Sequence, residues 1–146
     1  MNHLSILITD DDEDDCLFLR QAIERNTGGA IVIEAHNGEQ ALKCIAKQAD
    51  RSGFGLIILD INMPGMSGLE VLDEVRSRPS LKNIPVIMLS TSGSADEISV
   101  AYKKGVNSYI QKPNSYTHYD EIAKAIKTCF TDALFSRVPD FVSLSA

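Results

Sequence analysis

Short apolar runs alternate with amphipathic stretches along the chain. The runs are rich in Ile, Val and Leu and are bounded by Gly, Pro, Asn or Asp, which is typical of strands. The predicted strands are Leu4–Thr9, Ile31–Ala35, Leu56–Leu59, Val86–Leu89 and Ser108–Gln111. The stretches after each run carry apolar residues at helical spacing. The predicted helices are Asp15–Arg25, Glu39–Gln48, Leu69–Val75, Asp96–Lys104 and Tyr116–Phe130.

This alternation predicts an α/β fold, a doubly wound five-stranded parallel sheet with five helices on its two faces. The third and fourth runs, LIIL and VIML, show no polar alternation, so we expect central strands that are covered on both sides. Periodicity leaves the order of the strands open. We interpret residues 1–133 as one domain and residues 134–146 as a C-terminal extension, and we expect no output domain.

Charge and composition narrow the functional classes. The net charge is −6 and the chain has no Lys/Arg block, which argues against direct nucleic-acid binding. No apolar run is long enough to span a membrane, and the acidic N-terminus does not resemble a signal peptide. Cys16, Cys44 and Cys129 are far apart in apolar patterns, so we expect buried thiols in a reducing cytoplasm rather than disulfides or metal ligands.

The chemically reactive residues lie where the predicted strands end. Asp10 and Asp11 end the first strand, Asp60 ends the third, Ser90 ends the fourth, and Lys112 follows the fifth. In open parallel α/β sheets, functional groups gather at the carboxyl ends of the strands. We therefore expect three carboxylates, a hydroxyl and an ammonium to converge at one edge. Any one of them could be a solvated loop residue, but strand ends place all five independently.

Carboxylates this close together repel unless a cation lies between them, and an all-oxygen ligand set suits Mg²⁺. Asp60 follows a rigid apolar strand and could attack a phosphoryl group as a nucleophile. The metal and Lys112 would offset charge on the transferred oxygens, and Ser90 could donate a hydrogen bond to the aspartyl phosphate. The acidic residues 12–14 are interpreted as a solvated helix start, which the helix dipole favours.

Four motifs in this order resemble the receiver domains of two-component response regulators. They are ITDDDEDD, LIILDINMPGMSGLEVL, PVIMLSTSG and GVNSYIQKPN, and the resemblance covers about Ser5 to Phe130. Arrangement and length are most similar to the small stand-alone regulators that serve bacteriophytochrome-type kinases. The resemblance implies a flavodoxin-like receiver fold.

The resemblance also implies roles for single residues. Asp60 would be the phosphoacceptor, and Asp11 would bind Mg²⁺ directly. Asp10 would support the metal through water, and Asn62 would offer its backbone carbonyl.

Three further residues take roles by the same resemblance. Ser90 and Lys112 would contact the phosphoryl group, with the Lys112–Pro113 peptide bond in the cis form. Tyr109 would be an aromatic switch that turns inward when Ser90 moves, although without the resemblance it would be interpreted as a half-buried strand residue.

The implied function is that of a single-domain response regulator rather than an enzyme. A sensor histidine kinase, of the phytochrome type by the same resemblance, would phosphorylate it, and output would pass by protein–protein contact to a downstream target. No contact with nucleic acid or membrane is expected. The apolar extension would either fold back on its own domain or extend a homodimer interface formed by the fourth helix, fifth strand and fifth helix.

Four other functions fit the sequence less well. An EF-hand loop starting at Asp10 would need Gly and Glu where Asp15 and Gln21 stand. A flavodoxin-like cofactor binder needs a phosphate-cradling loop, and TDDDEDD would repel a phosphate. A haloacid-dehalogenase-type phosphatase needs an Asp where Asn62 stands. A degenerate receiver that only docks would not need the intact acidic, hydroxyl and lysine set.

Overall fold

The structure is a computed structural model that describes residues 4–48 and 53–132. Within them, five parallel strands form one sheet in the order β2-β1-β3-β4-β5. The strands are β1 (Ser5–Thr9), β2 (Ile31–Ala35), β3 (Leu56–Leu59), β4 (Val86–Ser90) and β5 (Ser108–Gln111). The helices are α1 (Glu13–Thr27), α2 (Gly38–Gln48), α3 (Gly68–Ser77), α4 (Ala95–Lys103) and α5 (Tyr116–Ile126), which continues as a π-helical turn, η1 (Lys127–Asp132).

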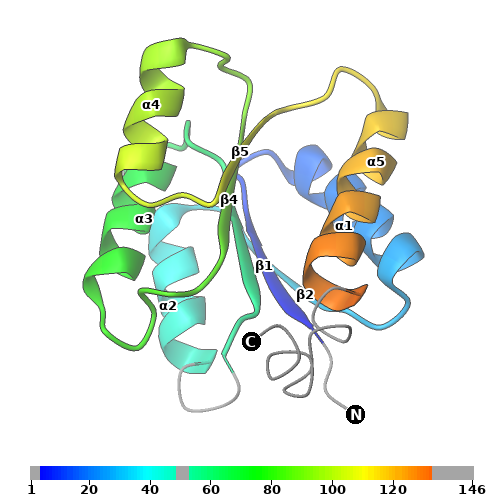
Figure 1. Cartoon of the computed structure of the whole chain (residues 1–146), viewed down its shortest axis with the longest axis horizontal. Coiled ribbons are helices and arrows are strands. Elements are labelled where there is room, and N and C mark those ends of the chain that lie inside the picture. Colours follow the sequence, from blue (N-terminus) through cyan, green and yellow to red (C-terminus); the bar gives the residue numbers. More distant parts are fainter. Residues whose placement is uncertain (1–3, 49–52, 133–146) are drawn as a thin grey trace, which may run out of the picture.

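The helices cover both faces of the sheet. Figure 1 shows α2, α3 and α4 on one side and α1 and α5 on the other. This arrangement confirms the predicted doubly wound fold. The strand order, which the pattern left open, places β1, β3 and β4 inside the sheet and β2 and β5 at its edges. The two runs without polar alternation therefore lie in the interior, as predicted.

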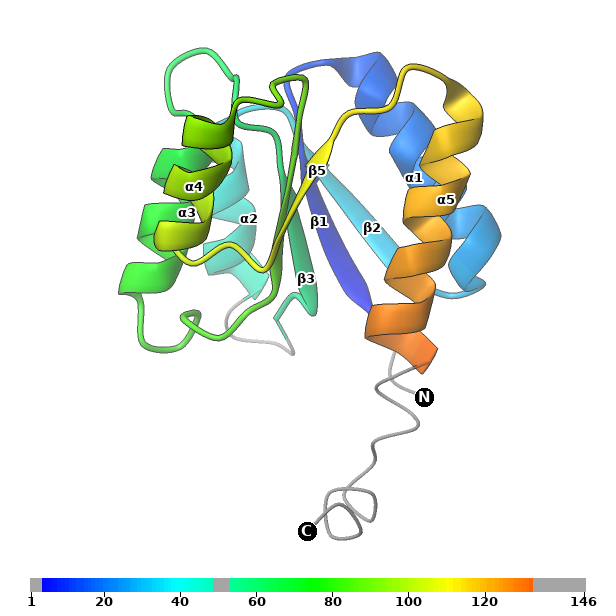
Figure 2. The ribbon, with the colours of Figure 1, turned by 45° about the horizontal axis from the view of Figure 1, so that its top comes forward.

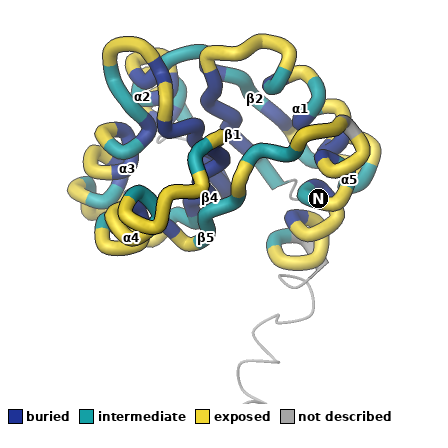
Figure 3. Tube along the Cα trace, turned by 90° about the horizontal axis from the view of Figure 1, so that it is seen from above, coloured by how far each residue is buried: buried dark blue, intermediate teal, exposed yellow. Residues whose placement is uncertain are grey.

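Two apolar layers hold the sheet between the helices. Successive side chains of a strand point to opposite faces, so Leu7 packs in the layer under α2, α3 and α4, while Ile6 and Ile8 pack under α1 and α5. Leu72 on α3 and Ile126 on α5 each contribute to one of the two layers from the helix side, and both are almost fully buried. Figure 3 shows the buried inner strands between helices whose outer sides are exposed, and the edge strand β5 is less buried. The rigid sheet fixes where each strand ends.

Local capping explains where two helices begin. α1 starts two residues before the predicted position, because the carboxylate of Asp12 accepts the main-chain N–H groups of Asp14 (2.9 Å) and Asp15 (3.0 Å). Asp12 is thus an N-cap rather than only a solvated residue. Ser67 accepts the N–H of Glu70 (3.3 Å) at the start of α3 and is the N-cap of that helix.

Two predictions from the sequence need correction. The described residues contain no cis peptide bond, so the predicted cis Lys112–Pro113 bond is wrong, and the trans form is favoured before proline by about 0.5–1 kcal/mol. The described cysteines are free, but Cys44 is only half-buried and Cys129 is exposed on η1, so the expected burial holds for Cys16 alone among them.

Two other expectations concern the ends of the chain and membranes. The extension at residues 134–146 lies outside the described residues. In the described part of the chain, no helix combines the length and apolar character that a membrane crossing requires.

Candidate functional site

The main chain places three reactive side chains at the same edge of the sheet. Asp10 donates its N–H to the last residue of β2 (3.1 Å), Asp60 to the last residue of β1 (2.9 Å), and Lys112 to the last residue of β4 (2.7 Å). Each bond extends the strand ladder by one residue and fixes the backbone of these residues. Figure 2 brings this edge forward, with the β4–α4 and β5–α5 connections above the strands.

The predicted acidic residues come together there. Asp10, Asp11 and Asp60 each offer a carboxylate oxygen, and these atoms lie within 4.8 Å of one another. Asp10 and Asp60 are both only 4% exposed, whereas Asp11 faces solvent. The side-chain amide of Asn62 reaches Ser90 Oγ at 3.4 Å, a contact that the sequence did not predict. The role of the Asn62 carbonyl as a metal ligand stays a prediction.

Burial makes it costly in free energy to ionise all the carboxylates of the acidic cluster. Burial raises the pKa of Asp60 to about 7, and the neighbouring charge of Asp10 adds to the rise. Burial raises the pKa of Asp10 as well, while the hydrogen bond from Lys112 opposes it. A divalent cation among these oxygens would favour the ionised carboxylates. The residues therefore fit a hard metal ion such as Mg²⁺.

Lys112 reaches into this cluster from the end of β5. Its Nζ lies 2.8 Å from Asp10 Oδ2, 2.9 Å from Asp15 Oδ2 and 3.7 Å from Asp60 Oδ2, and its side chain is 9% exposed. Burial disfavours the ammonium, but the hydrogen bonds to Asp10 and Asp15 outweigh this effect and raise the pKa of Lys112 above its ordinary value. The lysine is thus held as a cation at the centre of three carboxylates.

Asp15 is the site residue that sequence reasoning missed. Its position three residues after the capping Asp12 places it in the first turn of α1, where the helix dipole favours an acidic residue. This preference explains why position 15 is acidic, but it does not indicate which residue the carboxylate contacts. Only the tertiary structure shows that the carboxylate of Asp15 is directed to Lys112.

A chain of hydrogen bonds leads from the site toward α4. Ser90 is fully buried, and its hydroxyl accepts the N–H of Ser92 at 3.2 Å. The Tyr109 hydroxyl donates to the main-chain oxygen of Ser92 at 2.8 Å and lies 3.2 Å from Glu97 Oε1. Tyr109 is half-buried on β5, so both predicted switch residues contact the same loop.

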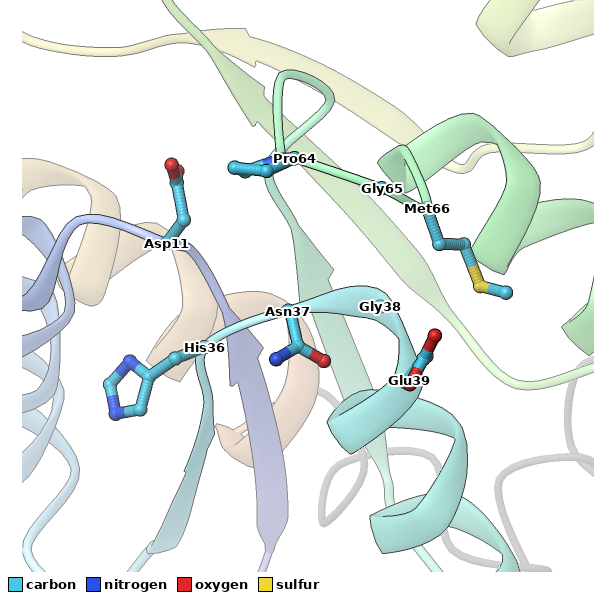
Figure 4. A pocket seen from close by; sticks show the side chains of 8 residues that line it. All are labelled: Asp11, His36, Asn37, Gly38, Glu39, Pro64, Gly65 and Met66. Atoms are coloured by element: carbon cyan, nitrogen blue, oxygen red, sulfur yellow. The ribbon is translucent and has the colours of Figure 1, made fainter.

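A pocket of about 320 Å³ opens beside Asp11. The β2–α2 connection lines one side, and the loop after Asp60 lines the other, with Pro64 and Met66 on that side (Figure 4). Behind this loop, a side chain on Gly68 would collide with the main-chain oxygen of Asp60. Gly68 therefore lets α3 start directly against the backbone of Asp60.

Comparison with known proteins identifies this arrangement. The family described as response regulator receiver domain matches residues 6–127. The chain belongs to this family. The chemotaxis protein CheY1 of Helicobacter pylori is 36% identical over 110 residues, which are 75% of this chain and 86% of that protein. The resemblance predicted from the motifs is confirmed.

Solved structures of phytochrome response regulators are similar to this receiver domain. The phosphorylated cyanobacterial phytochrome response regulator RcpA is 34% identical, with a TM-score of 0.81 over 88% of this chain and 94% of that one. The Mn²⁺-bound form of response regulator Rcp1 is 28% identical, with a TM-score of 0.75 over 86% of this chain and 93% of that one. Both share the flavodoxin-like receiver fold.

Membership of the family settles the general function. Response regulators receive phosphoryl groups from histidine kinases and act on downstream targets, and they are signalling proteins rather than classical enzymes. Receiver domains bind a divalent metal ion, and the cluster of Asp10, Asp11 and Asp60 is a group of residues that could hold one here.

Proposed function

We propose that Asp60 is the phosphoacceptor of this receiver domain. The observation that carries the proposal is the convergence on Asp60 of two further carboxylates and the Lys112 ammonium, which lies 3.7 Å from Asp60 Oδ2. An oxygen of Asp60 attacks the phosphorus of a phosphohistidine. The P–N bond breaks, and its electron pair stays on the imidazole nitrogen of the kinase.

Mg²⁺ is the proposed cofactor, held by Asp10, Asp11, Asp60 and the backbone carbonyl of Asn62. When bound, it supplies positive charge at the phosphoryl oxygens. Lys112, directly after β5, contributes a second positive charge, and Ser90 donates a hydrogen bond to the product. The position of Lys112 supports this role, because its ammonium already lies 3.7 Å from Asp60 Oδ2.

Signalling is proposed to use Ser90 and Tyr109 as a switch. A phosphoryl group on Asp60 accepts the O–H of Ser90 and draws this side chain toward Asp60, away from the N–H of Ser92 that its oxygen now accepts. The carbonyl of Ser92 also receives the Tyr109 hydroxyl, so movement of this loop releases the tyrosine from Glu97 on α4. The phosphoryl group thereby favours one of two conformations.

The proposed phosphodonor is a cytoplasmic sensor histidine kinase of the phytochrome type. The similarity to RcpA and Rcp1 supports this choice, and the free cysteines fit a reducing compartment. Output passes by protein–protein contact to a downstream target, and a homodimer through α4, β5 and α5 is one form of that contact. The acidic net charge of −6 supports a function without direct binding to nucleic acid or membrane.

Labelling tests the phosphoacceptor. The full chain is incubated with acetyl phosphate and Mg²⁺, and the added mass is mapped by mass spectrometry. We expect one phosphoryl group on Asp60, none in Asp60→Asn, and full labelling in the control Asp14→Asn, which changes an exposed acid of the same run. Undiminished labelling of Asp60→Asn would refute the proposal. Transfer from each purified histidine kinase of the source organism then identifies the donor.

A further inference from the structure

A cysteine, a glutamate and a histidine meet beside the main chain of Asp10. Cys16 lies on α1, Glu34 lies near the end of β2, and His36 directly follows β2. Each offers one possible ligand atom, and these atoms lie within 4.8 Å of one another. Cys16 is fully buried, whereas Glu34 and His36 are half-buried and connect the group to solvent.

The distances approach those of a tetrahedral zinc site. Bonds of about 2.0–2.3 Å place neighbouring ligand atoms roughly 3.3–3.8 Å apart. Cys16 Sγ lies 4.0 Å from His36 Nδ1, and both atoms lie near the main-chain oxygen of Asp10, at 3.5 and 3.3 Å. Cys16 faces Nδ1 of the ring, whereas the 3.7 Å contact of Glu34 is with Nε2. Binding one ion through Nδ1 therefore requires a rotation of the Glu34 carboxylate toward that nitrogen as well as a closer approach of Cys16.

Glu34 is oriented for such a role. Its Oε2 accepts a hydrogen bond from Arg20 Nη1 at 2.7 Å, and its Oε1 faces the His36 ring, 3.7 Å from Nε2. A hydrogen bond to one carboxylate oxygen leaves the other for a metal and holds the group in place. In Figure 4 the His36 ring points away from the loop that carries Pro64 and Met66.

The ligand chemistry separates this group from the acidic cluster. The carboxylates of the phosphorylation site suit a hard ion, whereas sulfur, nitrogen and a single carboxylate suit zinc and related transition metals. A core thiol bonded to a carbonyl and a separate Arg–Glu pair would be a simpler reading of the contacts. It leaves unexplained why three different ligand types from α1, β2 and the β2–α2 connection lie within 4.8 Å of one another.

We propose that Cys16, Glu34 and His36 bind one ion of the zinc class, with water in the fourth position. Burial raises the pKa of the Cys16 thiol, so the metal has to displace the thiol proton to solvent as it binds. The new sulfur–metal bond replaces the hydrogen bond of the thiol to the Asp10 carbonyl. The ion joins α1 to the end of β2 next to the phosphorylation site. This ion would be a second cation bound by the domain, and its binding would not require phosphorylation.

Titration of the full chain with Co²⁺ tests the sulfur ligand. Saturating Mg²⁺ is present so that the acidic cluster does not compete. We expect one equivalent of Co²⁺ to produce a near-ultraviolet thiolate-to-metal band that Zn²⁺ abolishes. The band should vanish in Cys16→Ser and remain in the Cys44→Ser/Cys129→Ser double variant. Because only sulfur ligation produces the band, Co²⁺ bound at the carboxylates cannot imitate it, whatever the fate of the proposed phosphorylation.

A histidine variant covers the case in which Cys16→Ser disturbs the core. His36 is half-buried at the surface, so His36→Gln should fold normally, as circular dichroism can verify. Competition with a chromophoric chelator should show Zn²⁺ affinity reduced at least tenfold in His36→Gln and unchanged in His118→Gln. The proposal is overturned if the parent shows no band, if Cys16→Ser keeps it, or if His36→Gln binds Zn²⁺ as tightly as the parent.

Discussion

At the scale of single residues, the acidic cluster and Lys112 form one electrostatic unit. Without a metal, the lysine is the cation that Asp10, Asp15 and Asp60 share. The charge of Lys112 offsets only part of the free-energy cost of burying these carboxylates, because burial still raises the pKa of Asp60 to about 7. Two variants separate the contributions of these carboxylates.

Asp60→Asn is expected to stabilise the metal-free protein at neutral pH and above. The pKa of Asp60 rises from an ordinary 3.8 to about 7 in the folded state. The folded protein therefore holds the proton between these values and loses stability as the pH rises through them. The increase in the free energy of unfolding of the variant over the parent should be absent below about pH 4 and reach about 2–4 kcal/mol at pH 8. Urea unfolding without divalent ions measures it, and an advantage that shrinks with rising pH contradicts this account.

Asp15→Asn is expected to tighten the binding of beryllofluoride, a phosphoryl mimic, by about three- to tenfold. The substitution weakens a charged hydrogen bond that competes for Lys112, and such bonds contribute about 1.5–3 kcal/mol, of which the remaining amide contact retains part. Asp14→Asn removes the same charge from an exposed neighbour and serves as the control. Equal gains in both variants would show a general charge effect instead of competition for the lysine.

At the scale of elements, the start of α3 is fitted to the backbone of Asp60, the proposed phosphoacceptor. The N–H of Gly68 donates to the main-chain oxygen of Ile61 at 3.0 Å, immediately after Asp60. The helix thus begins in contact with the backbone that carries the proposed nucleophile. Close approach at this point requires a residue without a side chain.

Gly68→Ala is expected to lower the free energy of unfolding by about 1–3 kcal/mol and to slow labelling by acetyl phosphate. The added methyl group collides with rigid backbone, so either α3 or the Asp60 loop must move. Gly93→Ala is the matched control, because its methyl group would meet only the flexible end of Gln111 at 3.1 Å. Denaturant unfolding and labelling rates are measured for both, and similar losses in the two variants would contradict the fitted contact.

At the scale of the whole molecule, β5 is an edge strand next to an open groove. The groove holds about 440 Å³ and runs between β5 and α5. Its lining residues are Ile110, Gln111, Pro113, His118, Glu121, Ile122 and Ala125. An unpaired edge beside apolar side chains is a surface on which a second chain can pack. It lies on the face proposed for the homodimer.

Beryllofluoride with Mg²⁺ is expected to shift the protein toward a dimer, and Ala125→Glu should prevent that shift. The substitution places a charge in the groove at an exposed helical position, so the fold should persist. Thr128→Glu, also exposed but outside the groove lining, should dimerise as the parent does. Light scattering gives the mass with and without the mimic. A parent that stays monomeric in both states excludes the dimer.

The sequence alone determined the features that depend on local physics. Alternating runs and helical spacing predicted the strands and helices to within a few residues, because side-chain periodicity reflects the local backbone. Strand ends predicted that Asp10, Asp60 and Lys112 would meet, because parallel strands present their carboxyl ends at one edge. The family followed from motifs whose spacing these same strands maintain.

Tertiary structure decided the features that depend on contacts between distant segments. Asp15 and Lys112 are 97 residues apart, and no local pattern marks them as partners. The strand order depends on which apolar faces pack best together. The convergence of Cys16 with His36 depends on how α1 lies against β2. Such pairings are set by the free energy of packing the whole chain, so they become visible only once the sheet and its two helix layers are assembled.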